Sequence, residues 1–260
     1  MSLIDLHIAP PFAEIILNRP EKRNALSIAM WDAIPALIEQ AVSDDAVKIV
    51  ILHGGRSGSF AAGADISEFE SIYGTRDDAA KSGGIIGAAL TAVERCPKPV
   101  IAAIDGACVG GGVSLALATD IRIANQNARL GITPAKLGLV YPPLDTLLLL
   151  KAVGNSVAKD LLFTGRIVSA DEAKSMQLVD KLVPDGEDTL EHAKAYASQI
   201  AANSQWSVRA IKTMISGLND GWTTDTDAAR ELFLDGFQNE DFQEGHRAFL
   251  EKRKAAFTFK

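Results

Sequence analysis

The chain contains little of several things that would define a special class of protein. Two cysteines in 260 residues exclude a disulfide-rich miniprotein, and Cys96 and Cys108 are predicted to be reduced thiols rather than the two ends of a disulfide loop. No wholly apolar run approaches the roughly 20 residues that a membrane helix needs. The 26 basic residues are outnumbered by 33 acidic ones, and the net charge of −7 argues against general affinity for nucleic acid or anionic membranes.

The remaining composition is that of an ordinary globular protein. A hydrophobic content of 47% can build a sizeable core, and 23% charged residues are typical of a soluble chain. The length fits one large domain, or one domain with an appended helical segment. The opening residues lack a basic stretch followed by a long apolar one, so no targeting segment is expected and a cytoplasmic location is predicted.

The first half of the chain alternates strand and helix patterns. Three short runs rich in Ile and Val predict strands: Ala13–Leu17, Lys48–His53 and Val100–Ile104. An amphipathic pattern over Ser27–Val42 predicts a helix with Ser27 as its N-cap and a kink or break at Pro35. A second helix is predicted over Ile85–Glu94. Strands separated by helices indicate β/α units with crossover connections.

The second half is predicted to be mostly helical. Short strand-like pieces at Ile121–Ala124 and Leu130–Ile132 come first. Helical patterns then follow at Ser156–Phe163, Ala170–Gln177, Glu187–Ala202, Ser204–Leu218, Thr224–Phe237 and Phe242–Ala256. We therefore expect a β/α core over residues 1–200 and a helical C-terminal region over 201–260, packed on the core or on a neighbouring subunit.

Two segments combine glycine and small residues just after predicted strands. They are Phe60–Phe69 (FAAGADISEF) and Asp105–Leu117 (DGACVGGGVSLAL). Glycine lets a backbone approach a ligand closely, and the start of a helix offers free N–H donors. Two such turns on adjacent strands could direct one N–H each at a carbonyl oxygen, forming an oxyanion hole. The alternative is two tight turns at which helices pack closely on a sheet. Neither segment fits a phosphate-binding or dinucleotide-binding loop.

These two segments, together with NRPEKRNALS, KPVIAAIDGACVGGGVSLALATDIRIAN and FTGRIVSADEAKSMQLVDKLVP, resemble the crotonase (enoyl-CoA hydratase/isomerase) superfamily over about residues 10–257. The resemblance implies an α/β fold, a spiral of β-β-α units with a helical C-terminal trimerisation region. It implies a homotrimer or a dimer of trimers. It also implies an acyl-CoA thioester substrate, with coenzyme A as part of the substrate and no separate cofactor, and an oxyanion hole that stabilises a thioester enolate.

The resemblance also assigns residues. The oxyanion donors would be the N–H groups of Ala64 and Gly111. The coenzyme A site would include Arg23, Ala25, Ala62, Asp65, Ile66 and Val109. Lys22 and Arg23 could supply positive charge for the phosphates, and the alternative for both is a solvated turn.

The two catalytic glutamates that the family's hydratases use are absent. Ser114 stands at the first position and Pro134 at the second. Because hydration needs one group to activate water and another to deliver a proton, ordinary hydration is disfavoured. Decarboxylation of a malonyl-type ester or double-bond isomerisation is favoured, and the alternative is a weak or inactive acyl-CoA-binding protein. Residues 131–141 and the C-terminal tail resemble methylmalonyl-CoA decarboxylase, which differs from this chain at Ala64 and Ser114.

Several polar residues remain candidates for proton transfer. They are Ser114, Thr133, Tyr141 and Asp145, with Asp65, Glu68 and Glu70 after the first glycine segment. Tyr141 could donate a hydrogen bond to a substrate carboxylate or act as a weak acid, and otherwise it is an aromatic core residue. Asp145 could be a base, but an N-cap for a helix starting near Thr146 is the favoured interpretation. Glu68 and Glu70 are expected on a solvated face. The four histidines lie outside every motif, so neither a metal site nor a histidine triad is expected.

Overall fold

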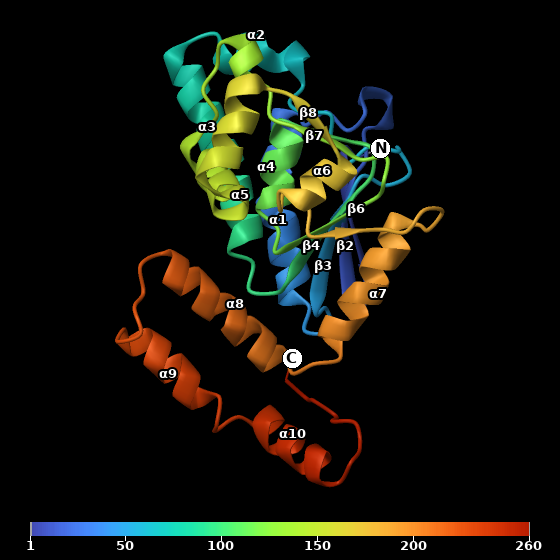
Figure 1. The fold of residues 1–260 in the computed structure, drawn as a ribbon, viewed down its shortest axis with the longest axis vertical. Helices are drawn as coiled ribbons and strands as arrows, with labels where there is room; N and C mark the ends of the chain where they lie inside the picture. Colours follow the sequence, from blue (N-terminus) through green and yellow to red (C-terminus); the bar gives the residue numbers. More distant parts are fainter. Residues whose placement is uncertain (1, 260) are drawn as a thin grey trace.

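A computed structural model describes residues 2–259 (Figure 1). Its main sheet has six strands in the order β1-β2-β3-β4-β6-β9, and a smaller sheet has the order β5-β7-β8. The strands are β1 (Ile4–Ala9), β2 (Phe12–Leu17), β3 (Ile49–His53), β4 (Val100–Ile104), β5 (Ala107–Val109), β6 (Ile121–Ala124), β7 (Arg129–Gly131), β8 (Ile167–Ser169) and β9 (Lys181–Leu182). The β1–β2 hairpin is antiparallel, whereas β2, β3, β4, β6 and β9 pair in parallel.

The helices alternate with the strands and then dominate the end of the chain. They are α1 (Ile28–Ser43), α2 (Phe69–Tyr73), α3 (Arg76–Glu94), α4 (Gly111–Leu117), α5 (Pro143–Thr164), α6 (Ala170–Ser175), α7 (Thr189–Ala201), α8 (Gln205–Asn219), α9 (Asp227–Asp235) and α10 (Glu240–Leu250). Short 3₁₀ turns lie at Pro20–Lys22, Ile66–Glu68 and Pro134–Leu137. No helix within residues 2–259 is long and apolar enough to cross a membrane.

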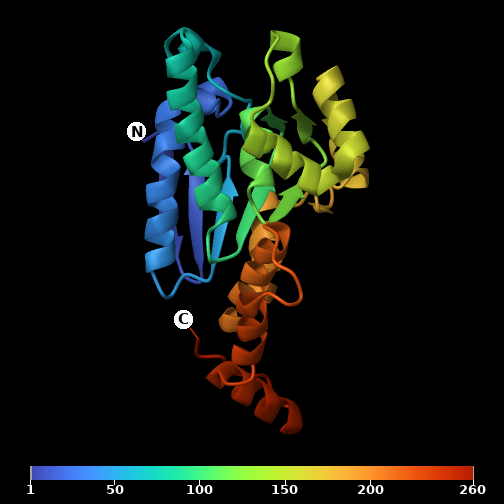
Figure 2. The same cartoon turned by 90° about the vertical axis from the view of Figure 1, so that its left-hand side faces the viewer.

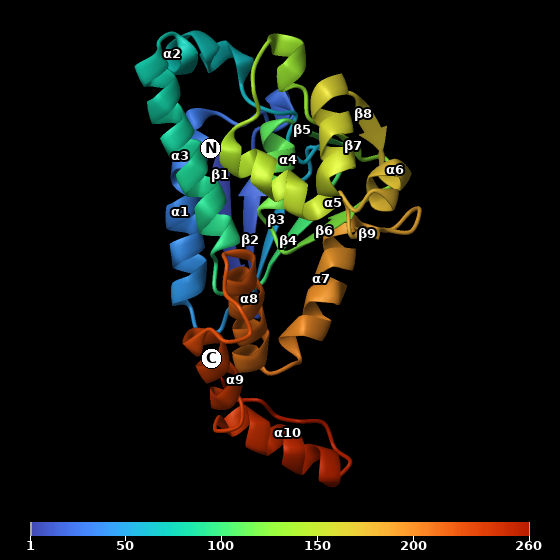
Figure 3. The same cartoon turned by 60° about the vertical axis from the view of Figure 1, so that its left-hand side comes forward.

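Both faces of the main sheet are buried, which explains why its central strands β3 and β4 are apolar except for His53. Successive residues of a strand point to opposite faces. In β3, Val50 and Leu52 join the larger core with α1 and α3, whereas Ile49 and Ile51 join a second core with α7. Figures 1 and 3 show α1 and α3 on one side of the sheet and α7 on the other. The buried sheet therefore leaves the ends of its strands to carry polar chemistry.

The predicted strands of the first half are confirmed, and α1 begins as expected. The Ser27 side chain accepts a hydrogen bond from the Met30 N–H at 3.3 Å. Of the kink or break predicted at Pro35, the break is wrong, because α1 continues through Pro35 to Ser43. Four strands were not predicted: β1, β5, β8 and β9. Three of these are only two or three residues long, too short for any periodicity to indicate them.

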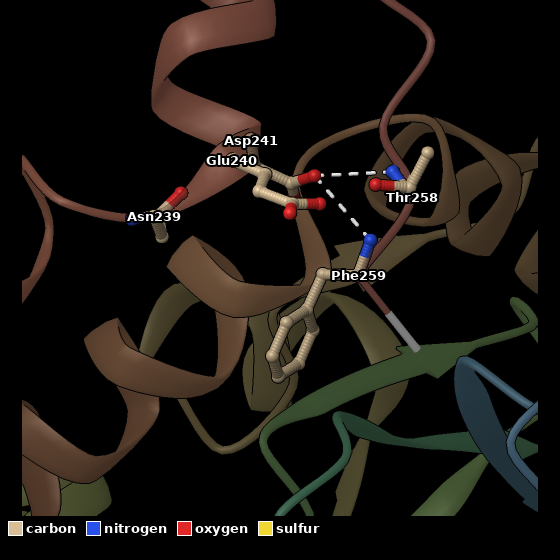
Figure 4. A pocket seen from close by; sticks show the side chains of 5 residues that line it. All are labelled: Asn239, Glu240, Asp241, Thr258 and Phe259. Carbon is tan, nitrogen blue, oxygen red and sulfur yellow. Dashed lines mark hydrogen bonds between the residues drawn. The ribbon is translucent and has the colours of Figure 1, made fainter.

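The last three helices extend away from the sheet as an arm (Figure 2). The chain's end then returns and is held by Asp241, whose buried carboxylate accepts the N–H groups of Thr258 at 3.1 Å and Phe259 at 3.3 Å (Figure 4). The other carboxylate oxygen accepts the Ser204 hydroxyl at 2.6 Å. One aspartate thus ties the tail to the start of α10 and to the start of α8.

Two further side-chain features are the cysteines and a buried cluster of charged residues and histidine. Cys96 and Cys108 are free, as predicted, and both are buried. A buried ionic cluster joins three elements, because Glu14 of β2 lies 3.3 Å from His53 Nε2 and 3.1 Å from Lys194 Nζ of α7. Burial lowers the pKa of His53 despite the neighbouring Glu14 carboxylate.

We expect acid to destabilise the protein through His53. Because the pKa of His53 is lower in the folded than in the unfolded chain, the unfolded chain binds more protons as the pH falls below the ordinary value of 6.5. Stability should therefore fall with decreasing pH in that window. The slope of urea-unfolding free energy against pH should be shallower in His53→Gln, with His7→Gln as the control at an exposed position. An unchanged slope in His53→Gln would contradict this assignment.

Candidate active site

The two glycine-rich segments lie against each other at the ends of neighbouring strands. Strands β3 and β4, which precede them, are adjacent in the main sheet. The Ala61 N–H donates to Ala107 O at 2.9 Å, and the Val109 N–H donates back to Ala61 O at 2.9 Å. The predicted meeting of the two turns is therefore confirmed, and the first segment runs as a short parallel bridge beside β5.

The glycines are required by this close approach. A Cβ atom on Gly112 would lie 2.5 Å from Ala61 O, which is closer than real Cβ atoms come. A Cβ on Gly63 would lie 3.3 Å from Val109 O, and Gly63 also has φ of +116°, which side-chain-bearing residues rarely adopt. The glycines thus let two backbone segments pack together where larger residues would separate them.

The packed turns leave the two proposed oxyanion donors unused. Neither the Ala64 nor the Gly111 N–H donates a hydrogen bond to an acceptor within residues 2–259. Gly111 is the first residue of α4, where N–H groups have no partner in the helix and carry partial positive charge. The buried Trp31 ring packs behind it, since a Cβ on Gly111 would lie 3.1 Å from Trp31 Cζ2. The Ala64 and Gly111 N–H groups, which have no partner in the described part of the chain and are held by the packed turns, suit the stabilisation of a developing negative charge.

The turn of residues 19–26, which contains the proposed coenzyme A residues Arg23 and Ala25, is connected directly to the segment that contains Ala64. Arg23 and Asn24 both have left-handed backbones, with φ of 49° and 56°. The Arg23 carbonyl accepts the Ala62 N–H at 3.0 Å. The fully buried Asn24 side chain accepts the Arg19 N–H at 2.8 Å and donates to Gly54 O at 3.0 Å. These hydrogen bonds fix the backbone conformation of the turn, and the Arg23 side chain is exposed.

Asp65 and Lys22 are bound to each other. Asp65 is 5% exposed and accepts Arg19 Nη2 at 2.6 Å and Lys22 Nζ at 3.0 Å. Hydrogen bonds from Ser67, together with those from Lys22 and Arg19, hold the pKa of Asp65 well below its usual range. The side chain of Asp65 is thus engaged within the protein, and Lys22, which is exposed, is paired with it. Ile66 is 68% exposed, while Ala25, Ala62 and Val109 are partly buried.

Behind Gly111 the structure brings together three polar side chains from separate segments. Ser114 lies one turn further along α4, Tyr141 precedes α5, and Asp145 lies in the first turn of α5. The Ser114 hydroxyl donates to Asp145 Oδ1 in a very short hydrogen bond and lies 2.6 Å from the Tyr141 hydroxyl. Tyr141 also donates to Gly110 O at 3.1 Å. We call these three residues the polar triad.

The favoured interpretation of Asp145 as an N-cap is wrong. Pro142 occupies the N-cap position of α5, and no side chain caps that end. Asp145 is 4% exposed and accepts from Ser114 instead. The N-cap interpretation failed because the sequence places Ser114 and Asp145 31 residues apart, and only the packing of α4 on α5 brings them together.

Burial changes the acid–base properties of the polar triad. Burial raises the pKa of Asp145, although the hydrogen bond from Ser114 acts in the other direction. Burial and the Asp145 charge together raise the pKa of Tyr141 far above its usual range. Burial raises the pKa of Tyr73 in α2, and the Asp145 charge contributes to that rise. A carboxyl group with a raised pKa is a stronger base when ionised, as proton abstraction requires.

The other candidates from the sequence play smaller parts. Pro134 begins a 3₁₀ turn, and the Thr133 hydroxyl caps nothing there. Glu68 is not simply solvated, because its carboxylate accepts the Ile28 N–H at the start of α1 at 2.8 Å. Glu70 is exposed, as expected. Within residues 2–259 no group of three or more His, Cys, Asp and Glu side chains could hold a metal ion.

Comparisons with known proteins define the family of this fold and site. The enoyl-CoA hydratase/isomerase family matches residues 9–260. The chain is 36% identical to a crotonyl-CoA hydratase of Syntrophomonas wolfei, covering 95% of each chain. It is 37% identical to a short-chain-enoyl-CoA hydratase of Clostridium acetobutylicum, covering 93% of this chain and 92% of the relative. A solved enoyl-CoA hydratase/isomerase family protein from Hyphomonas neptunium is 60% identical, with a TM-score of 0.97 over 100% of this chain and 98% of the other.

The chain therefore belongs to the enoyl-CoA hydratase/isomerase family of the crotonase superfamily, and it has the mixed α/β crotonase fold with a helical C-terminal region. It is accordingly an acyl-CoA enzyme of this family. The similarity to methylmalonyl-CoA decarboxylase stays a prediction. So do the trimeric assembly and the cytoplasmic location.

Sequence reasoning missed three residues that shape the site. Trp31 packs behind Gly111, Asn24 fixes the turn of residues 19–26, and Tyr73 lies within the electrostatic reach of Asp145. The asparagine that follows Lys22 and Arg23 was the one available signal in the sequence, because Asn adopts positive φ more readily than most residues. Trp31 and Tyr73 carry no such signal in the sequence.

Proposed function

We propose that this protein isomerises the double bond of an enoyl-CoA thioester through an enolate held by the N–H groups of Ala64 and Gly111, with Asp145 as the proton-transfer group. The observation that carries the proposal is the polar triad. It places a buried carboxyl group with a raised pKa against Ser114, one helical turn from the Gly111 donor. The site thus offers one acid–base group where the family's hydratases have two.

The proposed reaction needs a single group that takes and returns one proton. The ionised Asp145 carboxylate, directly or through the Ser114 hydroxyl, takes a proton from C2 of a 3-enoyl thioester. The C–H electron pair moves into a C1–C2 double bond, and negative charge collects on the thioester oxygen, giving a dienolate. Ala64 and Gly111 stabilise that oxygen. As the thioester carbonyl re-forms, C2 bonds doubly to C3 and the C3–C4 electron pair takes the proton back at C4. The product is the 2-enoyl thioester, with no atom gained or lost.

Hydration is supported less well by the same geometry, even though the relatives above are named hydratases. Hydration needs one group that activates water and another that protonates C2. Ser114 and Pro134 occupy the two glutamate positions, and Ser114 already donates its only proton to Asp145. Asp145 is the single carboxyl group of the polar triad, so the second role has no carboxylate to fill it there.

Decarboxylation of a malonyl-type thioester is the second candidate. Loss of CO₂ produces the enolate directly, so it needs the oxyanion donors and no base. Burial raises the pKa of Asp145, so holding this group neutral beside a substrate carboxylate costs less than it would for an exposed aspartate. The Tyr141 hydroxyl is engaged by Gly110 and Ser114, which counts against its proposed hydrogen bond to that carboxylate.

A turnover screen of the purified protein tests these functions against each other. The substrates are crotonyl-CoA, a 3-enoyl-CoA, malonyl-CoA and methylmalonyl-CoA, with mass spectrometry as the readout and incubation in D₂O to reveal exchange at C2. We expect conversion of the 3-enoyl ester to the 2-enoyl ester. Loss of CO₂ would favour the second candidate, rapid formation of 3-hydroxyacyl-CoA would overturn the argument from the missing glutamates, and tight binding without turnover would indicate an acyl-CoA-binding protein.

A further inference from the structure

A group of ion pairs joins the turn of residues 19–26, the proposed nucleotide-binding turn, to Asp65, which follows Ala64. The Asp65 carboxylate accepts Arg19 Nη2 at 2.6 Å and Lys22 Nζ at 3.0 Å. It also accepts the Ser67 hydroxyl at 2.6 Å and the Ser67 N–H at 3.0 Å. We call Arg19, Lys22, Asp65 and Ser67 the Asp65 latch. Its carboxylate is buried beside a residue whose N–H is a proposed oxyanion donor.

The backbone reinforces the Asp65 latch on both sides of Ala64. The Leu26 N–H donates to Gly63 O at 2.7 Å, and the Asp65 N–H donates to Leu26 O at 3.0 Å. On the turn's side, Arg19 Nη1 donates to Ala25 O at 3.1 Å. Residues 63–65 therefore cannot shift without moving the turn of residues 19–26, since charged and backbone hydrogen bonds connect them.

The charges of the Asp65 latch face outward as well as inward. Arg19 is 13% exposed and is enclosed, whereas Lys22 is 43% exposed. The turn contains three basic side chains, those of Arg19, Lys22 and the exposed Arg23. They outnumber the two carboxylates, which belong to Asp65 and to Glu21, whose carboxylate lies 3.7 Å from Arg19 Nε. A phosphate that approaches the turn would thus meet net positive charge, and it would share Lys22 with Asp65.

We propose that the Asp65 latch couples binding of the nucleotide part of coenzyme A to the alignment of the Ala64 N–H, and that Asp65 is therefore a positioning residue rather than a ligand of coenzyme A. The inference rests on the proposed oxyanion role of Ala64. Phosphates bound at the turn contact Lys22 and Arg23. Because Lys22 is paired with Asp65, this binding restricts the position of the neighbouring Ala64 N–H.

Saturated thioesters test the coupling without any turnover. The probes are butyryl-CoA and butyryl-pantetheine, which lacks the nucleotide, each ¹³C-labelled at the carbonyl and observed by isotope-edited infrared spectroscopy on the bound ester. In the wild type, the carbonyl stretch should shift further to low frequency for the CoA ester than for the pantetheine ester. In Asp65→Asn, which keeps the side chain's shape and its capping oxygen, the difference between the two esters should be lost.

Kinetics give a second readout that a merely structural role would not move. With the substrate that the turnover screen identifies, Asp65→Asn should lower kcat for the CoA ester about 10- to 100-fold, as expected for a small misplacement of a catalytic donor, and hardly change kcat for the pantetheine ester. The matched control is Asp180→Asn, since Asp180 accepts Arg122 Nη2 at 2.7 Å and the Arg122 N–H at 2.8 Å at the β6–β9 edge of the sheet.

The outcomes separate the coupling from the proposed function. A wild type that shifts both carbonyls equally, or an Asp65→Asn variant that keeps the difference, would overturn the coupling while leaving the oxyanion hole in place. A wild type that shifts neither carbonyl would overturn the oxyanion role of Ala64 and Gly111, and the coupling with it. Loss of the difference in Asp180→Asn as well would show a general effect of destabilisation and would also overturn the coupling.

Discussion

Replacing Asp145 with asparagine is expected to remove most of the turnover and to make the protein more stable at neutral and alkaline pH. Asparagine keeps an oxygen that can accept the Ser114 hydroxyl but cannot take a proton, and loss of a general base typically costs about 10²- to 10⁴-fold in rate. The stability gain follows from burial. The pKa of Asp145 is raised in the folded chain, so the folded chain binds more protons than the unfolded one as the pH rises above the ordinary value of 3.8.

The sign of that difference means that wild-type stability falls as the pH rises through the window between 3.8 and the folded pKa, and the deficit persists above it. The Asp145→Asn variant would carry no such deficit. Thermal unfolding of both proteins between about pH 5 and 8, alongside initial rates, checks the two effects together. Asp241→Asn serves as the control, because Asp241 is another buried aspartate that accepts a serine hydroxyl but lies in the C-terminal region. Wild-type turnover in Asp145→Asn would refute the proposed base.

Replacing Gly111 with proline is expected to lower kcat about 100- to 1000-fold, which corresponds to the loss of one oxyanion donor. Proline has no N–H, and the first position of a helix tolerates its ring, so α4 can still form. The Gly111 N–H has no partner within residues 2–259, so its removal breaks no internal hydrogen bond.

The complication is steric, and a matched variant resolves it. Any Cβ at this position would lie 3.1 Å from Trp31 Cζ2, so the ring of Trp31 must move slightly. Gly111→Ala introduces the same Cβ while keeping the N–H. The ratio of kcat values for the alanine and proline variants therefore measures the donor itself. Equal rates in the two variants would show that the Gly111 N–H does not stabilise the transition state.

The structure changes how the missing glutamates are understood. From the sequence, their absence indicated a site without a strong acid or base and favoured decarboxylation or isomerisation over hydration. The polar triad supplies a carboxyl group from α5, a segment that contains neither of the two glutamate positions. The balance therefore moves toward isomerisation, which one such group can perform.

The sequence by itself determined the family, the central strands and the two glycine-rich turns. These features are local: the runs of Ile and Val in β3 and β4 specify buried parallel strands, and the glycines around Ala64 and Gly111 specify turns that only small residues can form. Ser27 likewise determines where α1 begins. Each depends on residues within a few positions of one another.

The contacts of Asp145, the proposed acid–base group, and those of the Asp65 latch were decided only by the tertiary structure. Asp145 meets Ser114 across 31 residues, and Lys22 meets Asp65 across 43, because α5 packs on α4 and residues 19–26 pair with residues 61–65. The raised pKa of Asp145 has the same origin, since burial is a property of the packed core. Nothing in the neighbouring residues distinguishes a buried, hydrogen-bonded aspartate from a helix cap, and so the sequence favoured the commoner of the two.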